Sequence, residues 1–209
     1  MSERIALDLL DPKAVRKRAR TVGIGALIVA GAFGGLLGLL AGRTAGLVTA
    51  AVFALPLLLL AWSEARRRVW LDGRVLSVRA FGTRSVDLHV ADQLDLLVTD
   101  MRGTRTVGLF VRGGGKAINL ALAIYAGTGG REQGVLSLRK LADVLAGRGD
   151  APGLVFSELL VAQLRAEARG LAAADRPLYR LGSMAPTGRL AQKLTPEAIS
   201  RFVSTLDQA

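Results

Sequence analysis

The sequence predicts a membrane α+β protein. A two-helix transmembrane hairpin precedes a small antiparallel β barrel or sandwich capped by a helix, and further helices follow at the C-terminal end. Residues 21–42 and 44–63 predict the hairpin because both runs are uncharged and reach the roughly 20 residues needed to cross about 30 Å of hydrocarbon. Short segments of alternating apolar and polar residues, separated by glycine-containing turns, predict the β part from residue 69 onward.

A cleaved signal peptide and a buried soluble hairpin are the alternatives for the two apolar runs. The apolar core of a signal peptide normally covers about 7–15 residues. The first run here is longer, and a second one follows after the single residue Arg43. A protein of 209 residues seldom buries two such runs side by side. We therefore predict that both runs are membrane spans.

Basic residues gather at one end of the predicted hairpin and indicate its orientation. Eight of them flank the entry to the first span and the exit from the second: Lys13, Arg16, Lys17, Arg18, Arg20, Arg66, Arg67 and Arg68. Only Arg43 lies at the other end. The positive-inside rule then predicts a multi-pass protein of the cell (plasma) membrane with both termini cytoplasmic. The eight residues set the topology alone, or they also contact anionic lipid head groups, at on the order of 1 kcal/mol each.

Small residues recur along the first span and predict close helix packing. Four of them are spaced by four positions and two form a second pair: Ala30, Gly34, Gly38 and Gly42, with Gly31 and Gly35. Helices in lipid associate through close backbone approach rather than through apolar burial. This face packs on the second span of the same chain or on a second copy of the protein. Neither span contains an ionisable residue, which argues against an ion or substrate pathway.

Residues 66–147 are predicted to form the β module. Asp72-Gly73 suits a tight hairpin turn between two strands. A glycine-rich loop is predicted over residues 127–134, and residues 135–138 are predicted as a last short strand. A helix is predicted from Ser137 or Leu138 to Ala146. The strands are predicted at residues 69–71, 74–80, 86–88, 94–98, 107–111 and 117–123, and the apolar face of the helix at Leu138, Leu141, Ala142 and Leu145.

This layout resembles the bacterial pleckstrin-homology-like (PH-like) family, whose members often follow paired transmembrane helices. The resemblance is carried by the segment WLDGRVLSVRAFGTRSVDL, the further strands and the terminal helix LRKLADVLAG, and it covers about residues 66–147. It implies a seven-stranded, helix-capped module used for binding and assembly. It implies no catalytic residues.

The two ends of the chain are predicted as separate segments. Residues 1–20 form a basic cytoplasmic segment, and residues 151–209 form a helical extension with a helix over 156–174 and a loop over 176–188. A last helix begins near Thr195 and carries an apolar stripe of Ile199, Phe202, Val203 and Leu206. This stripe docks on its own domain, on a partner protein or on the membrane surface.

Few side chains suit catalysis. The chain has no cysteine and one histidine, His89, so thiolate sites are excluded and a zinc site lacks ligands. The glycine-rich segment 112–116 is not a phosphate loop, because Phe110 stands where that motif needs glycine and Ala117 where it needs a hydroxyl. We therefore expect no catalytic residue, no metal site and no cofactor, and we predict that the protein is not an enzyme.

The net charge of +11 suits an anionic membrane surface or nucleic acid. Few aromatic side chains are available for base stacking, and the charge is concentrated beside the spans, so lipid is favoured and nucleic acid is not expected. The predicted function is a membrane-anchored scaffold of the bacterial inner membrane that presents the β module to a protein partner. The alternative is an accessory subunit of a larger membrane enzyme or transporter, packing through the glycine-rich first span. A second copy of the chain is a further candidate partner.

Overall fold

The computed structural model describes residues 4–10, 12–186 and 191–206, with the backbone alone for residues 12–14. The chain divides into two compact units. The hairpin unit comprises residues 10–67 and 79–82. The β unit comprises the described residues within 1–9, 68–78 and 83–209. The C-terminal helices share a hydrophobic core with the strands of the β unit.

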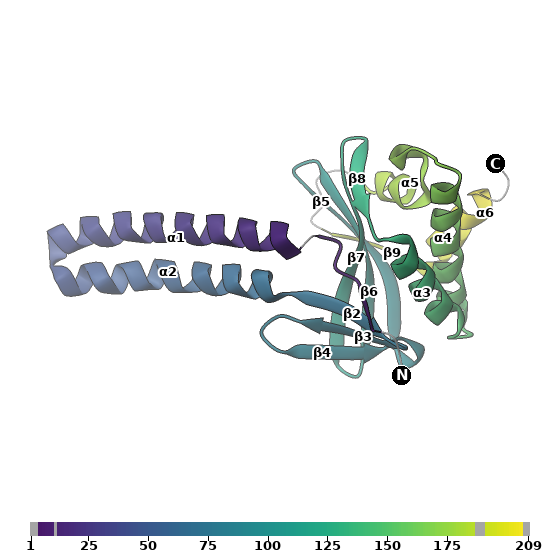
Figure 1. Ribbon diagram of the computed structural model, residues 1–209, viewed down its shortest axis with the longest axis horizontal. Helices are drawn as coiled ribbons and strands as arrows, with labels where there is room; N and C mark the ends of the chain where they lie inside the picture. Colours follow the sequence, from purple (N-terminus) through teal and green to yellow (C-terminus); the bar gives the residue numbers. More distant parts are fainter. Residues whose placement is uncertain (1–3, 11, 187–190, 207–209) are drawn as a thin grey trace. The chain divides into compact units, whose positions relative to one another are not determined.

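The hairpin unit consists of two long antiparallel helices, α1 (Pro12–Ala41) and α2 (Arg43–Arg66) (Figure 1). Their 30 and 24 residues correspond to lengths of about 45 and 36 Å at 1.5 Å per residue. Gly42 alone joins them, with φ of 90°, a value that a glycine adopts without steric cost. Both helices are long and apolar enough to cross a membrane, as predicted.

The β unit contains two antiparallel sheets. The first has the order β1-β2-β3-β4, and the second has the order β8-β7-β6-β5-β9. The short helix η1 (Leu88–Val90) connects the two sheets, and β4 packs against β6 and β7. The strands are β1 (Arg4–Ala6), β2 (Arg68–Asp72), β3 (Val75–Arg79), β4 (Thr83–Asp87), β5 (Gln93–Met101), β6 (Thr104–Gly113), β7 (Lys116–Ala126), β8 (Gly129–Glu132) and β9 (Gln192–Leu194). The mixed α+β class is thereby confirmed.

The glycine-rich segment 112–116 forms the tight turn between β6 and β7. Gly113 pairs with Lys116 across the ladder, and the two intervening residues, Gly114 and Gly115, have φ of 56° and 73°. Positive φ at both central residues is typical of a two-residue hairpin turn. The segment is therefore a hairpin turn and not the strand-to-helix connection of a phosphate loop.

The helices of the β unit are α3 (Val135–Ala146), α4 (Ala151–Ala168), η2 (Ala173–Asp175), α5 (Pro177–Ser183) and α6 (Pro196–Leu206). Helices α3 to α6 lie on one side of the five-stranded sheet (Figure 1). Helix α5 contacts β6 and β7, α6 contacts β5, and α4 packs on α3 and α6. The predicted apolar face of α3 is buried at all four positions and packs beside η1.

Three local predictions were wrong. The expected loop at 127–134 contains β8, which pairs with β7 through backbone hydrogen bonds that need no side-chain pattern. Residues 135–138 form the first turn of α3 rather than a strand. The expected loop at 176–188 contains α5, which begins at Pro177 and buries Leu178 and Leu181. Helix α4 also begins earlier than predicted, because the carboxylate of Asp150 accepts a hydrogen bond from Gly153 N at 2.9 Å and caps it.

Candidate functional site at the basic end of the hairpin

The two helices of the hairpin unit approach each other most closely at glycines. A Cβ atom on Gly46 would lie 2.5 Å from the backbone oxygen of Gly34 and 2.7 Å from the Cα of Gly38. Ala30 is only 2% exposed on the same face of α1. Ala30, Gly34 and Gly38 therefore lie on the face of α1 that packs against α2 of the same chain, the simpler of the two predicted arrangements. Gly46 is the facing residue on α2, and it was not among the six small residues predicted to pack.

The other small residues of the predicted packing set lie elsewhere. A Cβ atom on Gly31 or Gly35 would have no neighbour within 4 Å, and both residues are exposed. Gly42 forms the turn between the helices and likewise has open space around it. The predicted set of six thus divides into a contact face, an uncovered face and a turn.

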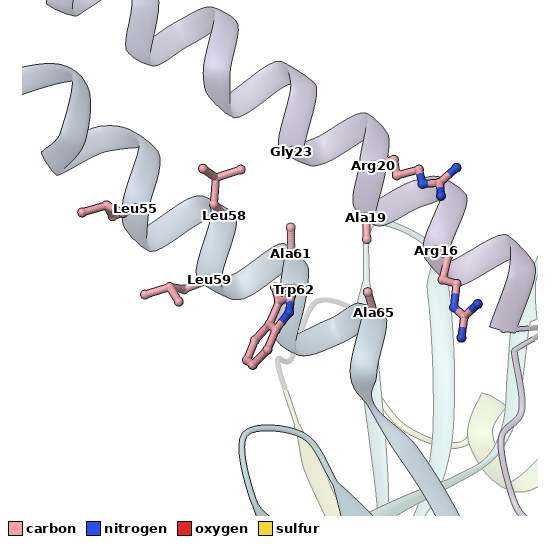
Figure 2. A pocket seen from close by; sticks show the side chains of 10 residues that line it. All are labelled: Arg16, Ala19, Arg20, Gly23, Leu55, Leu58, Leu59, Ala61, Trp62 and Ala65. Carbon is pink, nitrogen blue, oxygen red and sulfur yellow. The ribbon is translucent and has the colours of Figure 1, made fainter.

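A groove opens between the helices at their basic end, with a volume of about 570 Å³. Figure 2 shows it between the first turns of α1 and the last turns of α2. Ala19 and Gly23 of α1 face Ala61 and Ala65 of α2, and these side chains are too small to fill the space between the helices. The rest of the lining comprises Arg16 and Arg20 from α1 and Leu55, Leu58, Leu59 and Trp62 from α2.

An aromatic cluster stands beside this groove. The guanidinium of Arg66 lies 4.3 Å from the ring centre of Trp62, and the ring centres of Trp62 and Phe81 are 6.0 Å apart. Trp62 is 45% exposed and Phe81 is 65% exposed. Tryptophan is enriched where a membrane meets water. In the sequence, a tryptophan near the end of an apolar run followed by three arginines is the signal for this cluster, and the prediction of lipid contact rested on the arginines alone.

A second groove of about 520 Å³ flanks the same end of the hairpin. It shares Ala19 and Ala61 with the first groove, but its charged residues are Arg18 from α1 and Glu64 from α2. One groove thus carries two arginines and no carboxylate, whereas the other carries one arginine and one carboxylate.

The eight predicted lipid-contact residues do not form one set. Arg16, Lys17, Arg18 and Arg20 are exposed on α1, and within the described part of the chain none of them pairs with a carboxylate. Arg66 and Arg67 are exposed at the end of α2. Arg68 begins β2 in the other unit and pairs with Asp8 at 3.7 Å. Lys13 belongs to α1, and its side chain lies outside the described residues.

The apolar stripe of α6 is part of the core of the β unit. Ile199, Phe202 and Val203 are 0%, 7% and 6% exposed, and Leu206 packs against the same cluster. The expectation that these four side chains dock a partner is therefore corrected. They dock on their own domain, because α6 covers β5 and α4 with its apolar face.

Three polar residues of the β unit, among them the single histidine, make structural contacts. His89 Nε2 lies 3.1 Å from the carbonyl oxygen of Val144, and Asp95 pairs with Lys193 at 2.7 Å. Burial and a hydrogen bond to Glu132 raise the pKa of Tyr125 far above its ordinary value. Among the residues that the structure describes, no three His, Cys, Asp or Glu side chains are grouped to hold a metal ion.

Comparisons of the chain with protein-family models, with curated proteins and with solved structures found no match. A function is therefore inferred from the geometry of the hairpin unit and its basic end.

Proposed function

We propose that the protein is a non-enzymatic, membrane-anchored scaffold whose hairpin spans the bilayer and holds the β unit at the cytoplasmic face. The observation that carries this proposal is the uncovered apolar surface of α1 and α2. Only 17% and 11% of their most apolar stretches are buried within the protein. Large exposed apolar patches are rare on soluble monomers. In a bilayer, lipid tails would cover this surface, so that its apolar side chains would contact hydrocarbon rather than water.

The charge distribution supports the orientation. The antiparallel hairpin brings the basic turns of α1 beside Arg66 and Arg67, with Arg43 at the opposite end. Basic residues close to a span favour the cytoplasmic side. Both chain ends are then cytoplasmic, and the protein is a multi-pass protein of the bacterial inner membrane.

The architecture of the β unit supports a PH-like module used for binding. Seven strands, β2 to β8, lie between α2 and α3, and β1 from the N-terminal segment adds one more strand to the first of the two antiparallel sheets. Helix α3 packs beside the connection between those sheets. The mechanism is tethering. Anchoring the module at the bilayer restricts it to a thin layer and raises its effective concentration near a partner in the same membrane.

Site-directed photo-crosslinking in native membranes tests the scaffold. A photoreactive residue in place of Arg112 or Lys116 probes the exposed β6–β7 turn, and the same residue in place of Leu39 probes an exposed position in the hairpin. The scaffold predicts a protein adduct from the β unit. Isolated monomers at every position, in membranes and after gentle detergent extraction, would remove its support.

The uncovered face with Gly31 and Gly35 favours the second candidate, an accessory subunit of a larger membrane enzyme or transporter. Gly34 and Gly38 are unsuitable for testing it, because they face α2 of the same chain. Replacing Gly31 and Gly35 with leucine blocks the uncovered face, and Ala32→Leu at an exposed neighbouring position is the control. Loss of the partner in the double variant, with retention in the control, supports the subunit. Retention in both supports the scaffold.

A further inference from the structure

We infer that the groove lined by Arg16, Arg20 and Trp62 binds a single anionic phospholipid. This inference rests on the proposed membrane location and adds a specific ligand and a specific side of the hairpin to it. Arg16 and Arg20 hold the lipid phosphate, and one acyl chain follows the leucines of α2 away from the arginines.

The phosphate site is built by two arginines one helical turn apart. Residues at i and i+4 lie on the same face of a helix, and Arg16 and Arg20 both line the groove (Figure 2). The described residues supply no carboxylate partner for either guanidinium. Guanidinium groups bind phosphate through paired, charge-assisted hydrogen bonds. The ion pairs recorded elsewhere among the described residues show the contrast, because their basic groups are already neutralised.

The acyl-chain site is built by the seam of the hairpin. Leu55, Leu58 and Leu59 line the groove on the side of α2, and Gly23 lines it on the side of α1, where a Cβ atom would lie 3.7 Å from Leu58 Cδ2. The groove volume of about 570 Å³ lies within the roughly 300–1,000 Å³ range of small-molecule sites. The leucines lie before Trp62 in α2, toward the middle of the predicted span, whereas the arginines lie at its basic end. The positive charges of the groove therefore lie at the level of a phospholipid head group, and its apolar surface lies at the level of the acyl chains.

Trp62 fixes the level of the head group. Its ring lines the groove, and Arg66 stacks on it at 4.3 Å. A third positive charge therefore stands on the α2 side of a groove whose other two charges come from α1. The second groove lacks this arrangement, because Glu64 places a negative charge there that repels a phosphate. The lipid is thus expected on one flank of the hairpin only.

Paired charge variants separate a built site from general attraction to an anionic surface. Arg16→Gln with Arg20→Gln removes the two arginines of the groove. Lys17→Gln with Arg18→Gln removes the same charge from exposed positions of α1 that do not line it. At about fivefold in affinity for each guanidinium that contacts the lipid phosphate, the first pair costs about 25-fold in preference for anionic over neutral lipid at Trp62. The second pair is expected to cost less than fivefold there.

The experiment measures quenching of Trp62 by lipids with brominated acyl chains. The chain has two tryptophans, so the full-length Trp70→Phe variant reports on Trp62 alone. It is placed in phosphatidylcholine vesicles that contain an equal small fraction of brominated phosphatidylglycerol or brominated phosphatidylcholine. The inference predicts stronger quenching by phosphatidylglycerol, loss of this preference in the groove variant and retention in the control. Co-purification of one phosphatidylglycerol with the native-sequence protein, measured by native mass spectrometry, gives the same answer without the tryptophan change.

Each contrary outcome has a distinct meaning. Equal quenching by the two lipids, or equal loss in the two variant pairs, overturns the lipid site while the membrane location stands. Relief of the preference by soluble glycerol phosphate would assign the arginines to a free phosphate compound instead and would also overturn it. Absence of quenching by either lipid would overturn the membrane location, and with it the proposed function.

Discussion

Gly46→Ala tests whether close glycine contacts hold the hairpin together. The added methyl group would lie 2.5 Å from the oxygen of Gly34 and 2.7 Å from the Cα of Gly38. Both are backbone atoms of the facing helix, so no side chain can rotate to make room. Favourable separations are about 3.5–4.0 Å, which means that the helices must part by about 1 Å and lose a quarter to a half of their contact energy at the seam.

The expected cost of this overpacking is about 1–3 kcal/mol. Alanine also gains about 1 kcal/mol over glycine from helix propensity, so the matched control is Gly31→Ala, which makes the same exchange in α1 where no atom lies within 4 Å. The assay is unfolding of the full chain in mixed micelles by increasing fractions of sodium dodecyl sulfate, followed through Trp62 in the Trp70→Phe background. Gly46→Ala should unfold at a lower fraction than Gly31→Ala. Identical transitions for the two variants would refute the glycine-mediated packing.

Two further predictions concern the junction between α3 and α4. The side chain of Arg148 is only 10% exposed and donates hydrogen bonds to the carbonyls of Leu88 and Ala91. Arg148→Ala should therefore lower the free energy of unfolding by about 2–3 kcal/mol, measured by thermal unfolding of the full chain in detergent. The control Arg139→Ala, at an exposed position of α3, should change it by less than about 0.5 kcal/mol. The hydrogen bond from Arg148 holds the pKa of Asp150 below its ordinary 3.8, so this carboxylate stabilises the fold above that pH and loses its contribution as pH falls through the lower, folded-state value. Asp150→Asn should therefore be less stable than the native sequence at neutral pH, and the difference in stability between the two proteins should shrink below pH 3.8. A difference in stability that stays constant from neutral pH to below pH 3.8 would contradict the reasoning.

Local sequence patterns predicted the elements that depend on local order. The two apolar helices follow from long uncharged runs, and the buried face of α3 follows from its helical periodicity. Strand β9 could not be predicted, because its three residues pair with β5, about a hundred positions earlier in the chain. Its ion pair between Lys193 and the buried Asp95 is equally distant in sequence. Strand β8 is mostly glycine at its start and has no apolar alternation to detect.

The candidate site was predicted only in part. The arginines of α1 were expected to contact anionic lipid as one cluster with those after α2. In the structure they lie on two flanks of the hairpin, one with Arg16 and Arg20 and the other with Arg18 and Glu64. This separation depends on how α1 and α2 pack against each other, which cannot be predicted from the sequence. The groove itself arises where Ala19 and Gly23 face Ala61 and Ala65, which becomes visible only when the two helices are paired.

Cysteine accessibility tests the central claim most directly, and the chain has no cysteine to interfere. Single cysteines replace Thr44 at the hairpin turn, Asp92 after η1 and Ser200 in α6, all at exposed positions. An impermeant maleimide is added to cells from which the outer membrane has been removed. If the hairpin spans the inner membrane and the β unit is cytoplasmic, the reagent labels Thr44→Cys while the inner membrane is intact. It labels the other two positions only after the inner membrane is opened. Labelling of Asp92→Cys or Ser200→Cys while the inner membrane is intact, or recovery of the full chain in the soluble fraction, would contradict the proposed membrane topology.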